Sequence, residues 1–362
     1  MGPMVPSMRG SGFLFLDTSA RLGTYNRTPG SSLGRLPRCF LLRGNNGLEG
    51  EFGMPVPISR NGKGGCPAKN AARPQVATAS IPCPGNGKPA GTAKQPDYTR
   101  LFETFGVEFS GNGSTNVQAA CPWCEGDRFY VDVETGQYKC HKAKCGQQGN
   151  ALTFIREMHR RALDATTDEH RRTLKRLRGW PLQTSKRFDL AWAADLGCWL
   201  LPSKSPKGTV VNLLRYWPPK GEDKGRKKNL PVLCSALFGL DALTAEASKT
   251  VFVCEGPFDA ISLDQHLRDR KTRARYDLLA VPGASTFKPE WARFLTGRTV
   301  RLLYDADEAG RKGQERAAKV LRDAGVSDIA VLRWPDGTPD GYDIGDLCKT
   351  NESIVDFTLS LS

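Results

Sequence analysis

The sequence has no long run of apolar residues. No segment reaches the roughly 20 consecutive apolar residues that a membrane-spanning helix needs, and the run at residues 13–16 is too short for the core of a signal peptide. A phosphate-binding loop of the form GxxxxGKS or GxxxxGKT is also missing, so we expect no nucleotide-driven motor in this chain. These absences predict a cytoplasmic protein without a membrane span.

Acidic residues are outnumbered by basic ones. The chain has 38 Asp and Glu against 52 Lys and Arg, which gives a formal net charge of +14 and a pI near 9.4. Such an excess favours a polyanionic partner, with nucleic acid as the first candidate and an anionic membrane as the second. Four of the 11 cysteines cluster with metal-ligand spacing and the others are scattered, which suits a reducing compartment.

Residues 1–96 lack both sustained apolar alternation and helical periodicity. They are rich in Gly, Pro, Ser, Asn and Arg, so we expect a disordered, low-complexity tail. In its first half Asp17 is the only acid before Glu49, a pattern that superficially fits an organellar transit peptide. A tail without organellar targeting is the favoured interpretation.

The rest of the 362-residue chain is long enough for several domains, and we predict a multidomain protein of α+β and α/β class. Alternating strand and helix patterns across residues 249–334 predict successive βα units and a mainly parallel sheet. The expected segments are a β zinc ribbon at 97–150, a helical connector at 151–179, a mixed basic subdomain at 180–248, the α/β domain at 249–340, and an acidic motif with a tail at 341–362.

Two pairs of cysteines have the spacing of a metal site. Cys121 and Cys124 form one knuckle, Cys140 and Cys145 form another, and 15 residues separate the two pairs. Four thiolates at this spacing can converge tetrahedrally on Zn²⁺ across a hairpin, so we predict one structural zinc. His141 could replace Cys140 or Cys145 as a ligand. The alternative to a zinc site is a set of buried cysteines that bind no metal.

Carboxylates follow two of the predicted parallel strands. Glu255 comes where the strand at 250–254 ends, Asp259 lies about one turn into the next helix, and Asp305 and Asp307 follow the strand at 300–304. Because the ends of parallel strands share one edge of a sheet, these acids should converge and repel one another unless a cation binds between them. Carboxylates suit Mg²⁺ or Mn²⁺, and Gly283 follows the intervening strand, where backbone can approach a phosphate. A solvated acidic edge is the alternative.

These motifs resemble a known family. Residues 121–150 resemble the zinc ribbon of DnaG-type bacterial primases and phage primase-helicases, although the second knuckle is longer than usual, and VFVCEGPFDAISL with LLYDADEAG resembles the Toprim domain of the same primases. The resemblance implies that Glu255 serves in proton transfer or metal binding and that Asp305 and Asp307 bind Mg²⁺ or Mn²⁺, with Asp259 in support. Asp343 and Asp346 resemble a further acidic motif of primases, and surface acids are an equally good interpretation.

Two further groups of residues bear on nucleic-acid binding. The segment between the ribbon and the Toprim motifs resembles the basic subdomain of primases, so the resemblance runs from about residue 98 to 348. A predicted basic hairpin could hold template phosphate or an incoming triphosphate, or could be a solubilising loop. Its members are Arg215, Lys224, Arg226, Lys227 and Lys228. The ribbon aromatics could stack on template bases or form the ribbon's own core. They are Trp123, Phe129, Tyr130 and Tyr138.

The resemblance implies a DNA primase that makes short RNA primers on single-stranded DNA from NTPs by metal-dependent nucleotidyl transfer. Such an enzyme would act at the nucleoid or replication fork, have no membrane partner, and use a replicative helicase, if at all, in trans. Two alternatives share the motifs: a non-catalytic mediator of recombination like RecR, which also pairs a zinc finger with a Toprim domain, and a Toprim nuclease.

Overall fold

The computed structural model describes residues 96–110, 115–220, 225–246 and 249–350. Nearly all of the tail predicted at 1–96 lies outside these residues, and so does Lys224 of the predicted basic hairpin. Among the helices of the described residues, none is long and apolar enough to cross a membrane.

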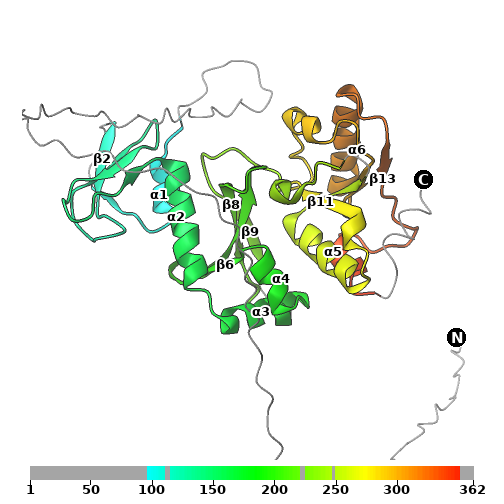
Figure 1. Ribbon diagram of the computed structural model, residues 1–362, viewed down its shortest axis with the longest axis horizontal. Helices are drawn as coiled ribbons and strands as arrows, with labels where there is room; N and C mark the ends of the chain where they lie inside the picture. Colours follow the sequence, from blue (N-terminus) through cyan, green and yellow to red (C-terminus); the bar gives the residue numbers. More distant parts are fainter. Residues whose placement is uncertain (1–95, 111–114, 221–224, 247–248, 351–362) are drawn as a thin grey trace, which may run out of the picture. The chain divides into compact units, whose positions relative to one another are not determined.

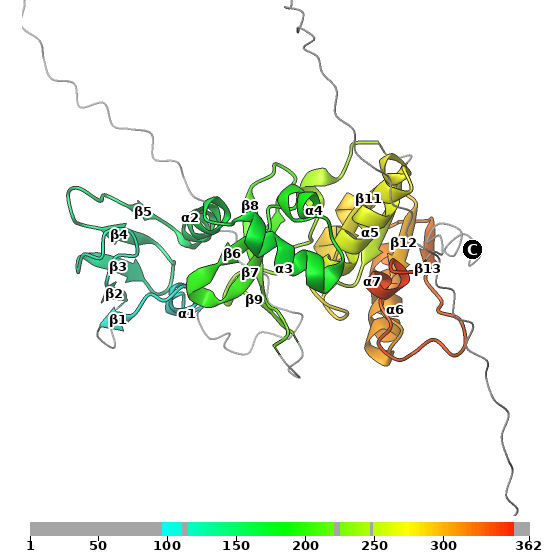
Figure 2. The same cartoon turned by 90° about the horizontal axis from the view of Figure 1, so that it is seen from below.

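The predicted ribbon is a five-stranded antiparallel sheet in sequence order (Figure 1, and with all five strands labelled in Figure 2). Its strands are β1 (Phe109–Ser110), β2 (Asn116–Ala119), β3 (Phe129–Asp132), β4 (Tyr138–Cys140) and β5 (Gln148–Gly149). The sequence predicts a hairpin around residues 134–136, and β3 and β4 form it. The Asp132 side chain accepts hydrogen bonds from the backbone N–H groups of Glu134 and Thr135, and Gly136 takes a φ of 68° in the turn.

Helix α1 (Thr99–Glu103) packs on the ribbon, and helix α2 (Ala151–Asp164) follows it. Asn150 caps α2, because its side chain accepts from the backbone N–H groups of Leu152 and Thr153 while the Thr153 hydroxyl accepts from the N–H of Asn150. Phe102, Phe129 and Phe154 make aromatic contacts in one buried cluster. The ribbon therefore shares a hydrophobic core with the start of the connector.

The connector continues with α3 (Asp168–Arg178), and Gly179 ends α3 in the left-handed conformation that favours glycine. The predicted basic subdomain begins with α4 (Leu182–Arg187). A second antiparallel sheet follows, with strand order β6-β7-β8-β9. Its members are β6 (Ala191–Ala193), β7 (Cys198–Lys204), β8 (Val210–Trp217) and β9 (Arg226–Asn229). Helix α4 and this sheet lie within the predicted mixed basic subdomain.

The α/β domain contains a four-stranded sheet in which every pairing is parallel, as predicted. The strands are β10 (Thr250–Cys254), β11 (Tyr276–Ala280), β12 (Val300–Leu303) and β13 (Ile329–Val331), in the order β11-β10-β12-β13. Alternate residues enter two separate cores: Phe252 packs with helix α5 (Pro257–Asp269), and Val253 packs with helix α6 (Glu308–Asp323). The two helices thus cover opposite faces of the sheet (Figures 1 and 2).

The alternation across residues 249–334 predicts a helix at 289–295 and a strand at 328–334, and both differ from the structure. The helix expected at residues 289–295 is the 3₁₀ helix η4 (Pro289–Phe294), held by i→i+3 hydrogen bonds such as Leu295 N–H to the Ala292 carbonyl. The strand expected at 328–334 is the shorter β13, which ends at Val331; beyond it the Trp334 indole N–H donates to the Tyr304 carbonyl, which follows β12.

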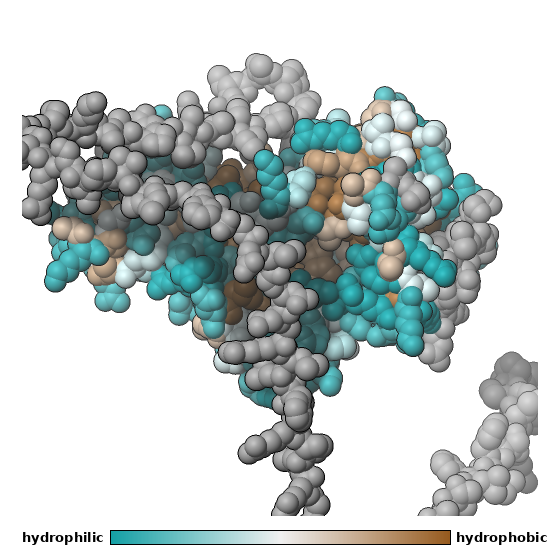
Figure 3. Space-filling view, in the orientation of Figure 1, coloured by the Kyte–Doolittle hydropathy of each residue, from teal (hydrophilic) through white to brown (hydrophobic). Residues whose placement is uncertain are grey.

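Helix α5 also holds the basic subdomain in place. Asp264, only 1% exposed, accepts charge-assisted hydrogen bonds from Arg187 of α4 and from Arg268 and Arg273, at 2.6 to 2.8 Å. Removing this carboxylate would leave three guanidinium groups without their shared partner, so it is a structural contact between the two segments. Among the described residues Leu177 is the only exposed large hydrophobic, and Figure 3 shows hydrophilic side chains over much of their visible face.

Candidate functional site

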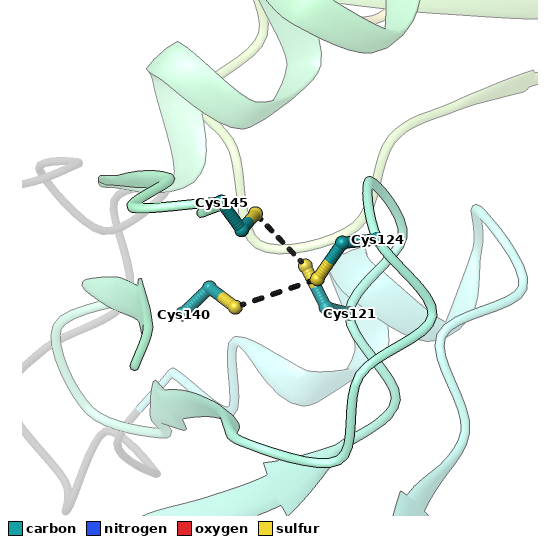
Figure 4. A group of neighbouring side chains, drawn as sticks. All are labelled: Cys121, Cys124, Cys140 and Cys145. Atoms are coloured by element: carbon teal, nitrogen blue, oxygen red, sulfur yellow. Dashed lines mark hydrogen bonds between the residues drawn. The ribbon is translucent and has the colours of Figure 1, made fainter. Parts of the chain in front are cut away.

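The four cysteines of the ribbon converge, and the side chains in Figure 4 point toward one another. All four sulfur atoms lie within 4.8 Å of one another, and the Cys121–Cys145 and Cys124–Cys140 sulfur distances are both 3.8 Å. Four sulfurs at the Zn–S distance of about 2.3 Å would form a tetrahedron with edges of about 3.8 Å, so the cluster fits zinc. His141 is not part of this group, and its ring lies edge-on to Tyr130, 5.7 Å between ring centroids.

The ribbon aromatics serve mainly the ribbon's own core. Trp123 stacks on Tyr138 with 5.3 Å between ring centroids, and Phe129 contacts both rings. Phe129 is fully buried and Tyr138 is 6% exposed. Tyr130, the fourth ribbon aromatic, is half-buried and lies outside that stack. Its hydroxyl donates to the Gln118 side chain. The core interpretation therefore accounts for Trp123, Phe129 and Tyr138.

The carboxylates gather at the topological switch point of the parallel sheet. The chain leaves β10 toward β11 and leaves β12 toward β13, in opposite directions, so a crevice opens between the carboxyl ends of β10 and β12. Glu255 follows β10 and accepts a hydrogen bond of 3.2 Å from the backbone N–H of Asp305, which follows β12. Asp259, 5% exposed, lies in the first turn of α5. The sheet brings these acids together as predicted.

Glycines allow this close packing. A Cβ on Gly256 would stand 2.8 Å from a carboxylate oxygen of Asp259, and a Cβ on Gly310 would stand 2.3 Å from the Asp305 carbonyl oxygen. Side chains at these positions would push the acids apart, because real Cβ atoms do not approach so closely. Asp307 caps α6 by accepting from the Gly310 N–H at 2.6 Å, and its charge acts on Glu255. It does not line the pocket that the other acids share.

Asp343 joins the cluster and Asp346 does not. Asp343 caps the short helix α7 (Ile344–Leu347). A Cβ on Gly345 would lie 3.0 Å from an Asp343 oxygen and 3.8 Å from an Asp259 oxygen, so these two carboxylates border the same point. Asp346 instead forms a surface ion pair of 2.7 Å with Lys349. The sequence did not decide whether these two acids belong to the site or to the surface, because their position depends on how the loop after β13 returns to α5.

Burial and mutual repulsion disfavour the charged form of these acids. Burial, then repulsion from Asp259 and Glu255, raises the pKa of Asp305 to about 8. Burial and the charge of Asp343 raise the pKa of Asp259, and burial also raises the pKa of Glu255. The Lys227 ammonium opposes all three shifts. A site that penalises negative charge this strongly is suited to bind divalent cations.

One pocket of about 190 Å³ joins the acids to the basic subdomain. It is lined by Lys227, Lys228 and Asn229 of β9, by the β10–α5 turn with Glu255, Gly256, Pro257 and Asp259, and by Leu214, Pro282, Gly283 and Asp305. Gly283 has a φ of 152°, a conformation that glycine adopts more readily than other residues. Two lysines and the glycine predicted for phosphate binding therefore lie where the carboxylates are.

Other predicted basic residues lie elsewhere. Arg215 is 8% exposed and donates to the Asn229 carbonyl, and the Arg226 guanidinium lies 4.3 Å from the centroid of the Trp217 ring. Neither lines the pocket. Sequence reasoning did not single out Arg178, whose guanidinium packs on Phe258 at 4.6 Å and favours the charged form of Asp259. In the sequence, Arg178 could have been recognised by its position in a basic helix, directly before Gly179.

In the absence of divalent metal, the stability of this protein should fall as the pH rises. The pKa of Asp305 is about 8 in the folded protein and about 3.9 in the unfolded chain. The contribution of this group to the free energy of unfolding is therefore fully present below about pH 3.9, and it is lost as the pH rises through about 8. Thermal melts in EDTA between about pH 5 and about pH 8.5 should show a falling Tm, with a flatter profile for Asp305→Asn. An equal slope in both proteins would contradict the burial of this charge.

Comparisons with known proteins match the α/β domain to a family. Residues 252–346 match the family described as Toprim-like, which confirms the resemblance of these residues to a Toprim domain. No curated protein matches the chain.

Solved structures with a similar arrangement include primases. The zinc-binding and RNA polymerase domains of the Aquifex aeolicus primase are 19% identical, with 69% of this chain and 79% of that chain covered and a TM-score of 0.40. The primase fragment of the bacteriophage T7 primase-helicase is 19% identical over 62% and 91%, with a TM-score of 0.37. The E. coli primase catalytic core is 16% identical over 58% and 78%, with a TM-score of 0.45.

Proposed function

We propose that this protein is a DNA primase that synthesises short RNA primers on single-stranded DNA by metal-dependent nucleotidyl transfer. The observation that carries the proposal is the pocket in which Glu255, Asp259 and Asp305 of a Toprim-like domain face Lys227 and Lys228 of strand β9. An acidic edge for cations beside a basic wall for phosphates is what transfer of a nucleotidyl group requires. The four-cysteine ribbon precedes this domain in the order that the primase resemblance implies.

In the proposed reaction, the 3′-hydroxyl oxygen of one nucleotide forms a bond to the α-phosphorus of the next NTP, and the bond to pyrophosphate breaks. A pair of bound Mg²⁺ or Mn²⁺ ions would activate the hydroxyl and neutralise the leaving group. Asp305 and Asp307 are proposed to hold these cations, with Asp259 in support. Glu255, whose pKa is raised by burial, is placed to bind a cation or to accept the hydroxyl proton.

The basic wall is proposed to position the phosphates. Lys227 and Lys228 line the pocket opposite the acids and can neutralise the triphosphate or the template backbone. Gly283, at the turn after β11, has no side chain to keep a phosphate from the backbone. Arg215 and Arg226, on the paired strands β8 and β9, remain candidates for longer-range attraction of a polyanion. Lys224 remains a candidate on the sequence alone.

The partners that follow from this proposal are a single-stranded DNA template and NTPs. A replicative helicase acting in trans is a further proposed partner, since the sequence has no phosphate-binding loop of the GxxxxGKS or GxxxxGKT form. Action at the replication fork belongs to the same proposal.

One assay separates this function from its alternatives. The purified protein is given single-stranded template, labelled NTPs and Mg²⁺ or Mn²⁺, and the products are separated by size. New short oligomers that require the template support a primase. A shortened template would indicate a Toprim nuclease, and binding without either product would indicate a RecR-like mediator; both results contradict the proposal.

A further inference from the structure

A second, larger hollow shares one lining residue with the catalytic pocket. It has a volume of about 660 Å³, and Asp305 lines both this hollow and the catalytic pocket. One wall is helix α6, and the other is the chain after β13, including Trp334, whose indole N–H holds it to the Tyr304 carbonyl. The proposed primase reaction does not by itself use this hollow, which we name the arginine groove after Arg311, Arg322 and Arg333 in its lining.

The α6 wall is one face of the helix. Its groove-lining residues recur at spacings of three or four: Arg311, Gln314, Glu315, Ala318 and Arg322. Residues with this spacing lie along one side of an α-helix. Arg311 and Arg322 are 11 positions apart, which is about 16 Å along the helix axis at about 1.5 Å per residue. The groove therefore has the length of a short oligonucleotide strand, which advances about 3.4 Å per nucleotide in a duplex.

The arginines of the groove are free of ionic partners. Among the residues that the structure describes, the side chains of Arg311, Arg322 and Arg333 have no carboxylate oxygen within 4.0 Å and make no hydrogen bond, although Glu315 and Asp336 also line the groove. On the remaining surface of α6, by contrast, Lys312 pairs with Glu308 and Lys319 pairs with Asp323. Planar guanidinium groups without partners are suited to bind phosphate oxygens bidentately.

We infer that the arginine groove binds the phosphate backbone of a nucleic-acid strand as the strand passes the catalytic carboxylates. The inference rests on the proposed function, because it identifies the surface that holds the template beyond the reacting nucleotide. The shared lining residue Asp305, a length of several nucleotides, and three unpaired guanidinium groups together fit a single strand better than one mononucleotide.

The test compares two triple variants of equal charge. The groove variant is Arg311→Gln, Arg322→Gln and Arg333→Gln, and the control is Lys312→Gln, Arg316→Gln and Lys319→Gln, which changes α6 outside the groove lining. The affinity for a fluorescent single-stranded oligonucleotide is measured by anisotropy over a range of salt concentrations, without NTPs or divalent metal. For single strands the plot of log K against log salt has a negative slope. Its magnitude decreases by about 0.7 for each phosphate that the protein no longer neutralises.

The groove variant should show a slope smaller by about 2 and at least about tenfold weaker binding at low salt, while the control keeps a slope close to that of the unchanged protein. Equal decreases in both variants, or none in the groove variant, would overturn the inference. So would a raised KM for NTPs with unchanged oligonucleotide affinity, which would mark a mononucleotide site. If the unchanged protein binds the strand but makes no oligomers, the proposed primase function fails while the slope still decides the groove.

Thermal melts identify any triple variant that fails to fold. The three groove arginines are exposed, so their replacement should cost little stability. If the triple variant nevertheless unfolds, the single variant Arg333→Gln, in the loop after β13, takes its place. It should decrease the magnitude of the salt slope by about 0.7. An unchanged salt slope in this variant would overturn the inference.

Discussion

Asp305→Asn should lower template-directed synthesis by at least about 100-fold, a loss of about 2.7 kcal/mol of transition-state stabilisation. The carboxylate lies at the switch point of the sheet, its backbone N–H holds Glu255, and its charge contributes to a site that repels anions unless cations are bound. Glu255→Gln should show a loss of similar size. Rates are measured as labelled nucleotide incorporated per minute at saturating template.

Affinity for single-stranded DNA should remain within about twofold in the same variants, because binding comes mainly from Lys and Arg neutralising phosphates. A matched control is Asp323→Asn, which removes an exposed carboxylate paired with Lys319 near the end of α6. This control should keep full synthesis, since exposed ion pairs contribute little. Full activity in Asp305→Asn, or joint loss of binding and synthesis in a folded protein, would remove the carboxylates from the catalytic site.

Cys121→Ser combined with Cys145→Ser should abolish zinc binding and unfold the ribbon. The four sulfurs have the separations of a tetrahedral zinc site, and structural zinc in small domains contributes apparent binding energies of about 10–16 kcal/mol, which such domains use to fold. Metal analysis should give one zinc per chain in the unchanged protein and almost none in the double variant. Limited proteolysis should then cut within residues 97–150.

The control for the zinc site is His141→Ala. This histidine adjoins Cys140 in the sequence, yet its ring lies against Tyr130 and outside the cysteine cluster. The variant should retain one zinc per chain and resist proteolysis. Zinc that persists in the double cysteine variant, or that is lost from His141→Ala, would show that the ligand set differs from the four cysteines.

Sequence reasoning was most successful where function depends on the ends of regular elements. The alternation of strands and helices places Glu255 and Asp305 after strands that turn out to be neighbours, and parallel pairing alone then brings the two acids together. The spacing of Cys121 to Cys145 similarly predicts a cluster that a hairpin can close. In both cases short-range pattern and sheet geometry are sufficient.

The remaining features depend on contacts that no local pattern encodes. Arg215 lies in a strand of mostly apolar residues, and its burial follows from the pairing of β8 with β7 and β9. Asp343 reaches Asp259 because the loop after β13 folds back toward α5. The 3₁₀ form of η4 and the end of β13 at Val331 likewise depart from simple periodicity, which does not distinguish a 3₁₀ helix from an α-helix and does not fix where a strand ends.

The most direct test of the central claim, that the carboxylate pocket starts and extends RNA chains on a template, uses NTPs labelled at the γ-phosphate. Each transfer releases the β- and γ-phosphates as pyrophosphate, so only the first nucleotide of a chain begun without a primer keeps this label. The account predicts γ-labelled oligomers that require single-stranded template and Mg²⁺ or Mn²⁺ and that disappear in Asp305→Asn. Incorporation of α-label without any γ-labelled oligomer, or no new oligomer at all, would contradict it.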